Sequence, residues 1–356
     1  MTRFSPAEIL AVFSTQADYC QSLGSPFMAR ALVMVRDLLA SSDSPFAKAV
    51  LNWPGDPRTN ADSVPLRVMG GLHALVLSGR DPALAAAYPP HRERALATAL
   101  SAAIMTHADF LIDWIKQAPQ TNETARQSPL VATACLLAER FQMPLHLIEL
   151  GASAGLNLRW DRTAVETPLG RLGNAGAAIT LSPDWQGSLP QGRGFTITSA
   201  RGVDLNPLDA TDPDQALRLL AYLWPDQPDR LARARKAIEL ANENPIKVAK
   251  ADAIDWLTTI LPDRPDSGLT LIYHTVAWQY FPQLQQQKGK ALIEATGATA
   301  TRKNPLAWLS MEADDGPKGA ALCLRLWPGD LTILLGRADF HARWVEWDAP
   351  SVLPQS

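Results

Sequence analysis

Charge of one sign is not in excess in this chain of 356 residues, in which 33 Lys and Arg stand against 36 Asp and Glu. The near balance does not support a broad basic field for nucleic acid, so we expect no nucleic-acid partner. Cysteine is scarce: Cys20, Cys135 and Cys323 lie far apart, in apolar segments and without metal-ligand spacing. We therefore expect buried free thiols in a reducing compartment, and no metal site.

A long uninterrupted apolar run is also missing. The opening MTRFSPAEIL has no extended apolar core of a signal peptide. The most apolar helix candidate, 95–115, is interrupted by His107, Asp109 and Asp113, which favours a buried helix over a membrane span. Since 47% of the residues are hydrophobic, disorder of the whole chain is excluded. We expect a soluble cytoplasmic protein without a membrane partner.

Residues 5–142 show helical spacing of apolar side chains. Pro6, Pro26, Pro65 and Pro82 each follow Ser, Val or Asp, as is typical of helix N-termini. The spacing predicts one long helix over 91–116 and, at Ser128–Pro129, a bend or a new helix. We therefore predict an all-helical N-terminal region over residues 1–143.

From residue 144 the period changes to short apolar runs separated by helical stretches. Such runs, bounded by turns, are typical of buried strands. Their alternation with helices predicts a mostly parallel sheet, and a hairpin around Pro328-Gly329 predicts an antiparallel last strand. The Gly- and Pro-rich span 159–194 fits an insertion that contains a hairpin. The expected strands cover 145–150, 195–198, 246–249, 269–273, 306–311, 321–326 and 331–335.

The predicted fold class is thus α/β: a Rossmann-like, mostly parallel sheet over 144–356, preceded by the helical region. The first strand leads into Glu149-Leu-Gly151-Ala-Ser153-Ala-Gly155. Gly151 permits a sharp turn, and Gly155 permits a helix or ligand to approach closely. The acidic Glu149 would repel phosphates, so this loop favours S-adenosylmethionine, which carries a sulfonium and an ammonium group. Two alternatives stay open: a nucleophile elbow with Ser153, and a turn that only packs.

Later strand ends supply further polar groups. Asp204 could bind ribose hydroxyls or form a turn. Asp252 could accept from an adenine amino group or cap the next helix. His274, after the fourth strand, could act as a general base, and Trp278 could form a pocket wall or belong to the core. Glu312, at the end of the fifth strand, is a further candidate.

The segment 120–126 places polar residues just before an apolar helix. One interpretation is an N-cap with Glu123 in the first turn, which the helix dipole favours. The other is that Asn122, Glu123 and Arg126 reach the cofactor or substrate when the helical region folds over the sheet. The sequence does not decide between them.

The sequence resembles a bacterial family, the domain-of-unknown-function 2332 proteins, along most of its length. The resemblance implies a fold similar to Rossmann-like methyltransferases behind a helical N-terminal region, and it supports the fold more than the activity. The residues that carry it are Gln120, Asn122, Glu123 and Arg126, the segment 149–157 with Asp161-Arg162, the segment 201–209, Trp224-Pro-Asp226-Gln with Arg230, and His274.

Together these features predict S-adenosylmethionine-dependent methyl transfer to a small molecule. The protein would hold the methyl group in line with an acceptor, so that positioning supplies much of the rate, and His274 would take or orient the acceptor's proton. Two other classes remain: a non-catalytic Rossmann-like protein that binds a nucleotide or a partner, and a serine hydrolase that uses Ser153.

Overall fold

The computed structural model describes residues 4–91 and 95–353. The chain divides into two compact units. The helical unit comprises Met1–Thr121 and Asp212–Arg235, and the sheet unit comprises Asn122–Thr211 and Lys236–Ser356. These units differ from the predicted ranges 1–143 and 144–356, because the last N-terminal helix packs with the sheet and a later helical segment belongs to the helical unit.

Serine and aspartate caps start most helices of the helical unit. The side chains of Ser5, Ser25, Ser44 and Asp81 each accept a backbone hydrogen bond, and a proline occupies the first turn that follows. The apolar faces then pack into one core. This unit consists of α1 (Pro6–Ser22), α2 (Pro26–Ser41), α3 (Pro45–Leu51), α4 (Val64–Leu77), α5 (Pro82–Ala86), α6 (Leu96–Thr106), α7 (Ala108–Ile115), α9 (Pro213–Ala221) and the first part of α10 (Pro228–Glu243).

The prediction of one helix over 91–116 is wrong. The helix is broken at His107 into α6 and α7, which are bent by 84°, and residues 92–94 lie outside the described part. At the break, Nε2 of His107 lies 3.4 Å from a carboxylate oxygen of Asp81. Among the described helices none is by itself long and apolar enough to cross a membrane; α6 and α7 reach that length only as this bent pair.

The sheet unit is built on a nine-stranded sheet with the order β5-β12-β11-β10-β9-β8-β1-β6-β7. Five neighbouring strands are parallel, as predicted: β9, β8, β1, β6 and β7. The strands β10, β11 and β12 add antiparallel pairs. The main strands are β1 (Leu145–Leu150), β6 (Ile197–Asp204), β7 (Ala249–Lys250), β8 (Leu269–Thr275), β9 (Leu306–Ala313), β10 (Ala320–Trp327), β11 (Leu331–Ala338), β12 (Trp344–Trp347) and β5 (Asp184–Gln186).

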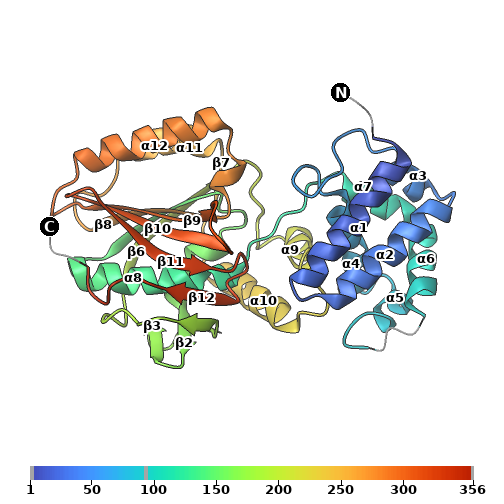
Figure 1. The fold of residues 1–356 in the computed structure, drawn as a ribbon, viewed down its shortest axis with the longest axis horizontal. Helices are drawn as coiled ribbons and strands as arrows, with labels where there is room; N and C mark the ends of the chain where they lie inside the picture. Colours follow the sequence, from blue (N-terminus) through green and yellow to red (C-terminus); the bar gives the residue numbers. More distant parts are fainter. Residues whose placement is uncertain (1–3, 92–94, 354–356) are drawn as a thin grey trace. The chain divides into compact units, whose positions relative to one another are not determined.

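Helices cover both faces of this sheet (Figure 1). Side chains alternate between faces along a strand, so Leu145 and Leu147 of β1 pack with α8 (Gln127–Phe141). Ile148 and Leu150 point to the other face, where α11 (Ala253–Ile260) and α12 (Gln283–Ala298) lie. This alternation decides which polar side chains can meet at the sheet edge.

Most of the span 159–194 forms a separate small sheet in the order β3-β2-β4, whereas β5, near the end of the span, joins the nine-stranded sheet. The predicted hairpin is present, since β2 (Thr163–Thr167) pairs antiparallel with β3 (Gly170–Gly173), and β4 (Ile179–Leu181) joins β2. A new helix begins at Gln127 after a 3-10 turn, which fits the fresh start predicted near Pro129. Cys20 and Cys135 are buried, whereas Cys323 is partly exposed, contrary to the expectation of three buried thiols.

Candidate functional site

The carboxyl ends of β7, β6, β1, β8 and β9 lie at one edge of the sheet, because these strands are parallel. The chain connection reverses direction next to β1: β6 follows on one side and β8 on the other. In open α/β sheets ligands bind outside the carboxyl ends at such a switch point. This edge is therefore the candidate site.

The loop after β1 has the tight backbone that its glycines suggested. Gly151 has φ of 75° and Gly155 has φ of 67°, both in the left-handed region. A Cβ atom on Gly151 would lie 2.6 Å from the Cβ of Ala277, in the loop after β8. The two loops on either side of the switch point therefore touch, and only glycine permits that approach.

Asp204 ties the same loop to the neighbouring strand. Its Oδ2 accepts a hydrogen bond from the amide of Ser153 at 2.9 Å, and its Oδ1 accepts from the amide of Asn206 at 2.9 Å. The turn-forming interpretation of Asp204 is thus present in the structure. Because each carboxylate oxygen accepts more than one hydrogen bond, this role leaves capacity for a ligand hydroxyl.

Glu149 is deeply buried, with 2% of its surface exposed. Burial raises the pKa of Glu149 well above its ordinary value, although the nearby Tyr273 hydroxyl acts in the opposite direction. That hydroxyl lies 2.8 Å from the carbonyl oxygen of Asn157 and 3.3 Å from Oε2 of Glu149. The hydroxyl of Tyr273 has one proton and can donate to only one of these two oxygens. If it donates to the carbonyl of Asn157, a protonated Glu149 can donate to the hydroxyl oxygen. A buried neutral carboxyl does not fit the predicted acidic anchor for a cationic cofactor.

This protonation makes stability depend on pH in a defined direction. An acid whose pKa is raised in the folded state favours folding at low pH. We expect the free energy of unfolding to fall as the pH rises above about 4.5, the ordinary pKa, because the unfolded chain then loses a proton that the folded chain keeps. Urea unfolding of wild type and Glu149→Gln between pH 5 and 8 measures this, with a slope of at most about 1.4 kcal/mol per pH unit. Parallel curves for wild type and Glu149→Gln would contradict this expectation. Glu166→Gln, at a partly exposed position of β2, is the control.

The segment before α8 belongs to the sheet unit and contacts the glycine loop. Asn122 Oδ1 accepts from the amide of Leu156 at 2.9 Å, and the side chain of Asn157 donates to the carbonyl of Glu123 at 3.3 Å. Glu123 also caps the 3-10 turn by accepting from the amide of Ala125. The cap interpretation thus has a counterpart in Glu123, and Asn122 supports the loop, whereas contact of this segment with a cofactor or substrate stays a prediction.

Arg126 spans two strand ends of the same unit. Its Nε donates to the carbonyl of Phe340 at 2.8 Å and its Nη1 to the carbonyl of Thr275, the last residue of β8, at 3.1 Å. The guanidinium therefore stabilises the backbone at the edge of the sheet. It does so from the sheet unit itself and not from a helical lid.

His274 is 1% exposed and both ring nitrogens have partners. The indole N–H of Trp308 donates to Nε2 at 3.1 Å, so the proton resides on Nδ1, which donates to Oε1 of Glu312 at 2.7 Å. The same Oε1 accepts from the amides of Ala277 and Trp278 at 2.9 and 3.0 Å. With both nitrogens occupied, His274 positions Glu312 and the loop, and it has no free lone pair for a substrate proton.

The predicted catalytic and anchoring residues do not meet. Glu149 lies opposite Tyr273 in the parallel pairing of β1 and β8, and both face α8. His274 follows Tyr273 along the strand, so it points to the other face with Glu312. The structure therefore joins Glu149 to Tyr273 and Asn157, and joins His274 to Glu312 and Trp278.

Glu312 also keeps capacity to bind a ligand. Burial alone would raise its pKa, but the hydrogen bonds from His274 and from two amides hold the pKa of Glu312 below its ordinary value. Its Oε2 is buried without a hydrogen-bond partner among the described residues. The adjacent Val276 has φ of 53°, a strained conformation for a β-branched residue. An ionised oxygen beside a strained loop is typical of a functional site.

Asp252 and Trp278 complete the edge. Asp252 is the N-cap of α11, since its Oδ1 accepts from the amides of Ile254 and Asp255 at 2.9 and 3.1 Å. Partial burial opposes ionisation, yet contact with Gln285 and the helix amides lowers the pKa of Asp252. Trp278 is half-buried and its ring stacks on His274 with centroids 4.8 Å apart.

Ser153 and metal binding can be judged from the same geometry. The Oγ of Ser153 is buried and has no hydrogen-bond partner within residues 4–91 and 95–353, so no described base activates it. The φ of Ser153, 53°, is strained as in a nucleophile elbow, but strain alone does not make a nucleophile. Over the described ranges, no group of three or more His, Cys, Asp or Glu side chains could hold a metal ion.

No site role was predicted for Tyr273 in β8, Gln127 at the start of α8 or Trp308 in β9. Asn157 entered only as the end of the segment 149–157 that carries the family resemblance. The amide of Gln127 donates to Asn157 Oδ1 at 3.0 Å, and Trp160 donates to Tyr273. The period-2 alternation of 269–275 could have placed Tyr273 on the face of Glu149 once the strand register was known.

Comparison with known proteins gives one family. A family with the description "Uncharacterized protein conserved in bacteria (DUF2332)" matches residues 11–347, which is most of the chain. A search of curated proteins gives no match.

Proposed function

The chain belongs to the DUF2332 family of bacterial proteins, and we propose that its sheet unit binds S-adenosylmethionine and transfers a methyl group to a small molecule. The observation that carries this proposal is the sheet edge: five parallel strands with a switch point at β1, where Gly151 closes against Ala277. When bound, the cofactor would supply an electrophilic methyl group on a sulfonium.

The charge at the edge supports a cationic ligand over a phosphate. Asp252 and Glu312 have pKa values below their ordinary range, so both are ionised at neutral pH. Asp204 adds a third carboxylate at the end of β6. S-adenosylmethionine carries two cationic groups and no phosphate, whereas dinucleotides place a pyrophosphate over this loop. Ser153 Oγ and Glu312 Oε2, which have no hydrogen-bond partner in the described part of the chain, leave polar groups for a ligand to satisfy.

Each residue at the edge then has a role that differs in part from the predicted one. Asp204 orders the loop and would accept from ribose hydroxyls, and Asp252 would accept from the adenine amino group while it caps α11. Glu312, held by His274, replaces Glu149 as the group that would attract a cation. Arg126 and Asn122 hold the loop backbone in place, which keeps the reacting groups oriented.

Asp252→Asn tests this proposal, because asparagine keeps the helix cap and removes the charge. We expect S-adenosylmethionine to bind the variant about tenfold more weakly than wild type, since a charge-assisted hydrogen bond is lost. Titration calorimetry measures the change. Asp330→Asn is the matched control: Asp330 lies in the turn after β10, at the opposite edge of the parallel strands. Equal affinity in wild type and Asp252→Asn would contradict the assignment of Asp252.

Turnover separates the proposed methyltransferase from a protein that only binds. Formation of S-adenosylhomocysteine with an acceptor from a panel of small amines, acids and alcohols would support the proposed reaction. Binding without any such product across the panel would point to the non-catalytic alternative.

A further inference from the structure

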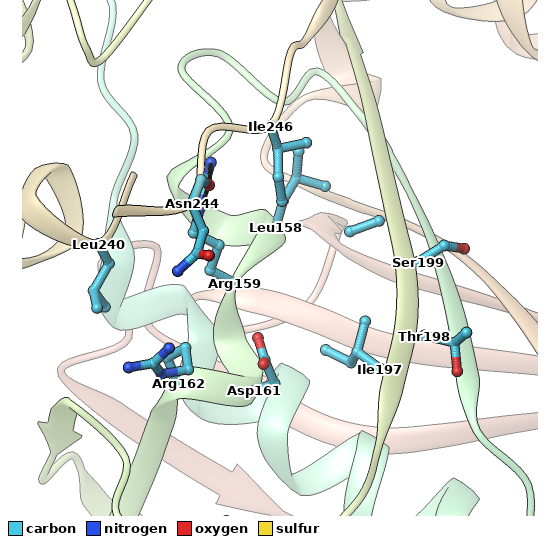
Figure 2. Close-up of a pocket in the computed structure, with 11 residues that line it drawn as sticks. Leu158, Arg159, Asp161, Arg162, Ile197, Thr198, Ser199, Leu240, Asn244 and Ile246 are labelled. Carbon is cyan, nitrogen blue, oxygen red and sulfur yellow. Dashed lines mark hydrogen bonds between the residues drawn. The ribbon is translucent and has the colours of Figure 1, made fainter. Parts of the chain in front are cut away.

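A cavity of about 290 Å³ lies in the sheet unit, away from the carboxyl ends of the strands. It borders the first half of β6. On this side β7 pairs only with Val203 and Asp204 at the end of β6, so it does not cover the first half of β6. The end of α10 and the segment after the glycine loop form the other walls (Figure 2). The cavity is therefore separate from the site proposed above.

The cavity walls combine aliphatic side chains with charged and polar ones. Figure 2 shows Leu158 and Ile246 on one side of the cavity, and Asp161 and Ile197 on another. The side chain of Leu240 adds to the apolar wall. A ligand in this cavity would thus place an aliphatic group against leucine and isoleucine side chains.

Two arginines at the cavity differ in what they bind. Arg159 is buried, and its donors are engaged: Nε and Nη2 donate to the carbonyl of Asn244 at 2.9 and 2.7 Å, and Nη1 donates to the carbonyl of Gly155 at 2.8 Å. Arg162 also lines the cavity. In the part of the chain that the structure describes, its guanidinium makes no hydrogen bond or ion pair.

Asp161 supplies the opposite charge. Its carboxylate forms no direct ion pair with Arg159 or Arg162 among the described side chains, and backbone amides of residues 161 and 162 lie close to it. Burial raises the pKa of Asp161, although the positive charges of Arg162 and Arg159 act in the opposite direction, and a ligand cation would further stabilise its charged form. An acid and a base that form no direct ion pair with each other, beside aliphatic side chains, match a ligand with both charges.

We propose that this cavity binds a free aliphatic α-amino acid. The ammonium group would contact Asp161, the carboxylate would contact the guanidinium of Arg162, and the side chain would lie against Leu158, Ile197 and Ile246. This site does not depend on the function proposed for the carboxyl edge, although Arg159 links its wall to Gly155 of the glycine loop.

Calorimetric titration of the full chain with L-valine, L-leucine and L-methionine tests the proposal. We expect at least one of them to bind with one site per chain. For leucine, 4-methylpentanoate lacks the ammonium group and 3-methylbutylamine lacks the carboxylate, and each should bind about tenfold more weakly or worse. No binding of any of the three amino acids would overturn the proposal, as would equal affinity for the amino acid and 4-methylpentanoate.

Variants test the two charged groups without removing packing. Asp161→Asn and Arg162→Gln should each weaken amino-acid binding about tenfold or more. Arg171→Gln, an exposed arginine of β3 that pairs with Glu166, is the matched control and should bind as wild type does. Unchanged affinity in both cavity variants would contradict the assigned contacts, and a far-ultraviolet circular dichroism spectrum equal to that of wild type establishes that each variant is folded.

Discussion

Gly151→Val is expected to lower the free energy of unfolding by about 3 kcal/mol or more and to abolish binding of S-adenosylmethionine. Left-handed backbone at a β-branched residue costs about 1–2 kcal/mol, and Gly151 has φ of 75°. The new side chain would also overlap Ala277, whose Cβ lies 2.6 Å from the position of the added Cβ, and such overpacking costs a further 1–3 kcal/mol or so. Urea unfolding and titration calorimetry measure the two effects.

Gly176→Val separates the cost of the left-handed backbone from the cost of steric overlap with a neighbouring side chain. Gly176 has nearly the same φ, 74°, but an added Cβ there meets no atom within 4 Å. We expect the free energy of unfolding of this control to fall only by the cost of backbone strain, and we expect ligand binding to be kept. If both valine variants lost the same stability, the close approach of the loops after β1 and β8 would not be what requires glycine at position 151.

Glu312→Ala is expected to destabilise the protein by about 3–5 kcal/mol, because one carboxylate oxygen satisfies three donors. These donors are the Nδ1–H of His274 and the amides of Ala277 and Trp278. Without Glu312 they remain buried and unpaired, and the loop that carries the strained Val276 loses its fixed point. Chemical denaturation monitored by tryptophan fluorescence measures the loss.

Glu312→Gln is the matched variant for this prediction. Glutamine keeps an oxygen acceptor for the three donors, so most of the stability should remain. It removes the negative charge, so affinity for a cationic ligand should fall about tenfold. Equal loss of stability in the alanine and glutamine variants would indicate that the charge, and not the hydrogen bonds, holds the loop.

Strong periodic signals in the sequence predicted the frame of the fold. The short, mostly apolar run of 145–150 predicted β1, and the alternation of such runs with helical stretches predicted the parallel order that the structure contains. Short or polar elements were missed: β5 and β12 have three and four residues, too few to show a period. β6 extends through Arg201 to Asp204, beyond the predicted end at residue 198, because its polar residues pair with β1.

The sequence placed the glycine loop and the polar strand ends together at the carboxyl edge of the sheet, but it did not predict their contacts. Gly151 was placed by backbone requirements, which a sequence reveals directly. The separation of Glu149 from His274 depends on which face each side chain takes, and this follows from the register between β1 and β8. Contacts such as that of Arg126 with Phe340 join residues far apart in the chain, and no local pattern encodes them.

The central claim is that the carboxyl edge around Gly151 and Asp252 binds an adenosyl cofactor. Calorimetric titration of the wild-type chain with S-adenosylmethionine and S-adenosylhomocysteine tests it most directly. We expect one site per chain with a dissociation constant on the order of micromolar, with binding lost in Gly151→Val and retained in Gly176→Val. The absence of any binding heat to folded wild-type protein at about millimolar ligand would contradict the claim.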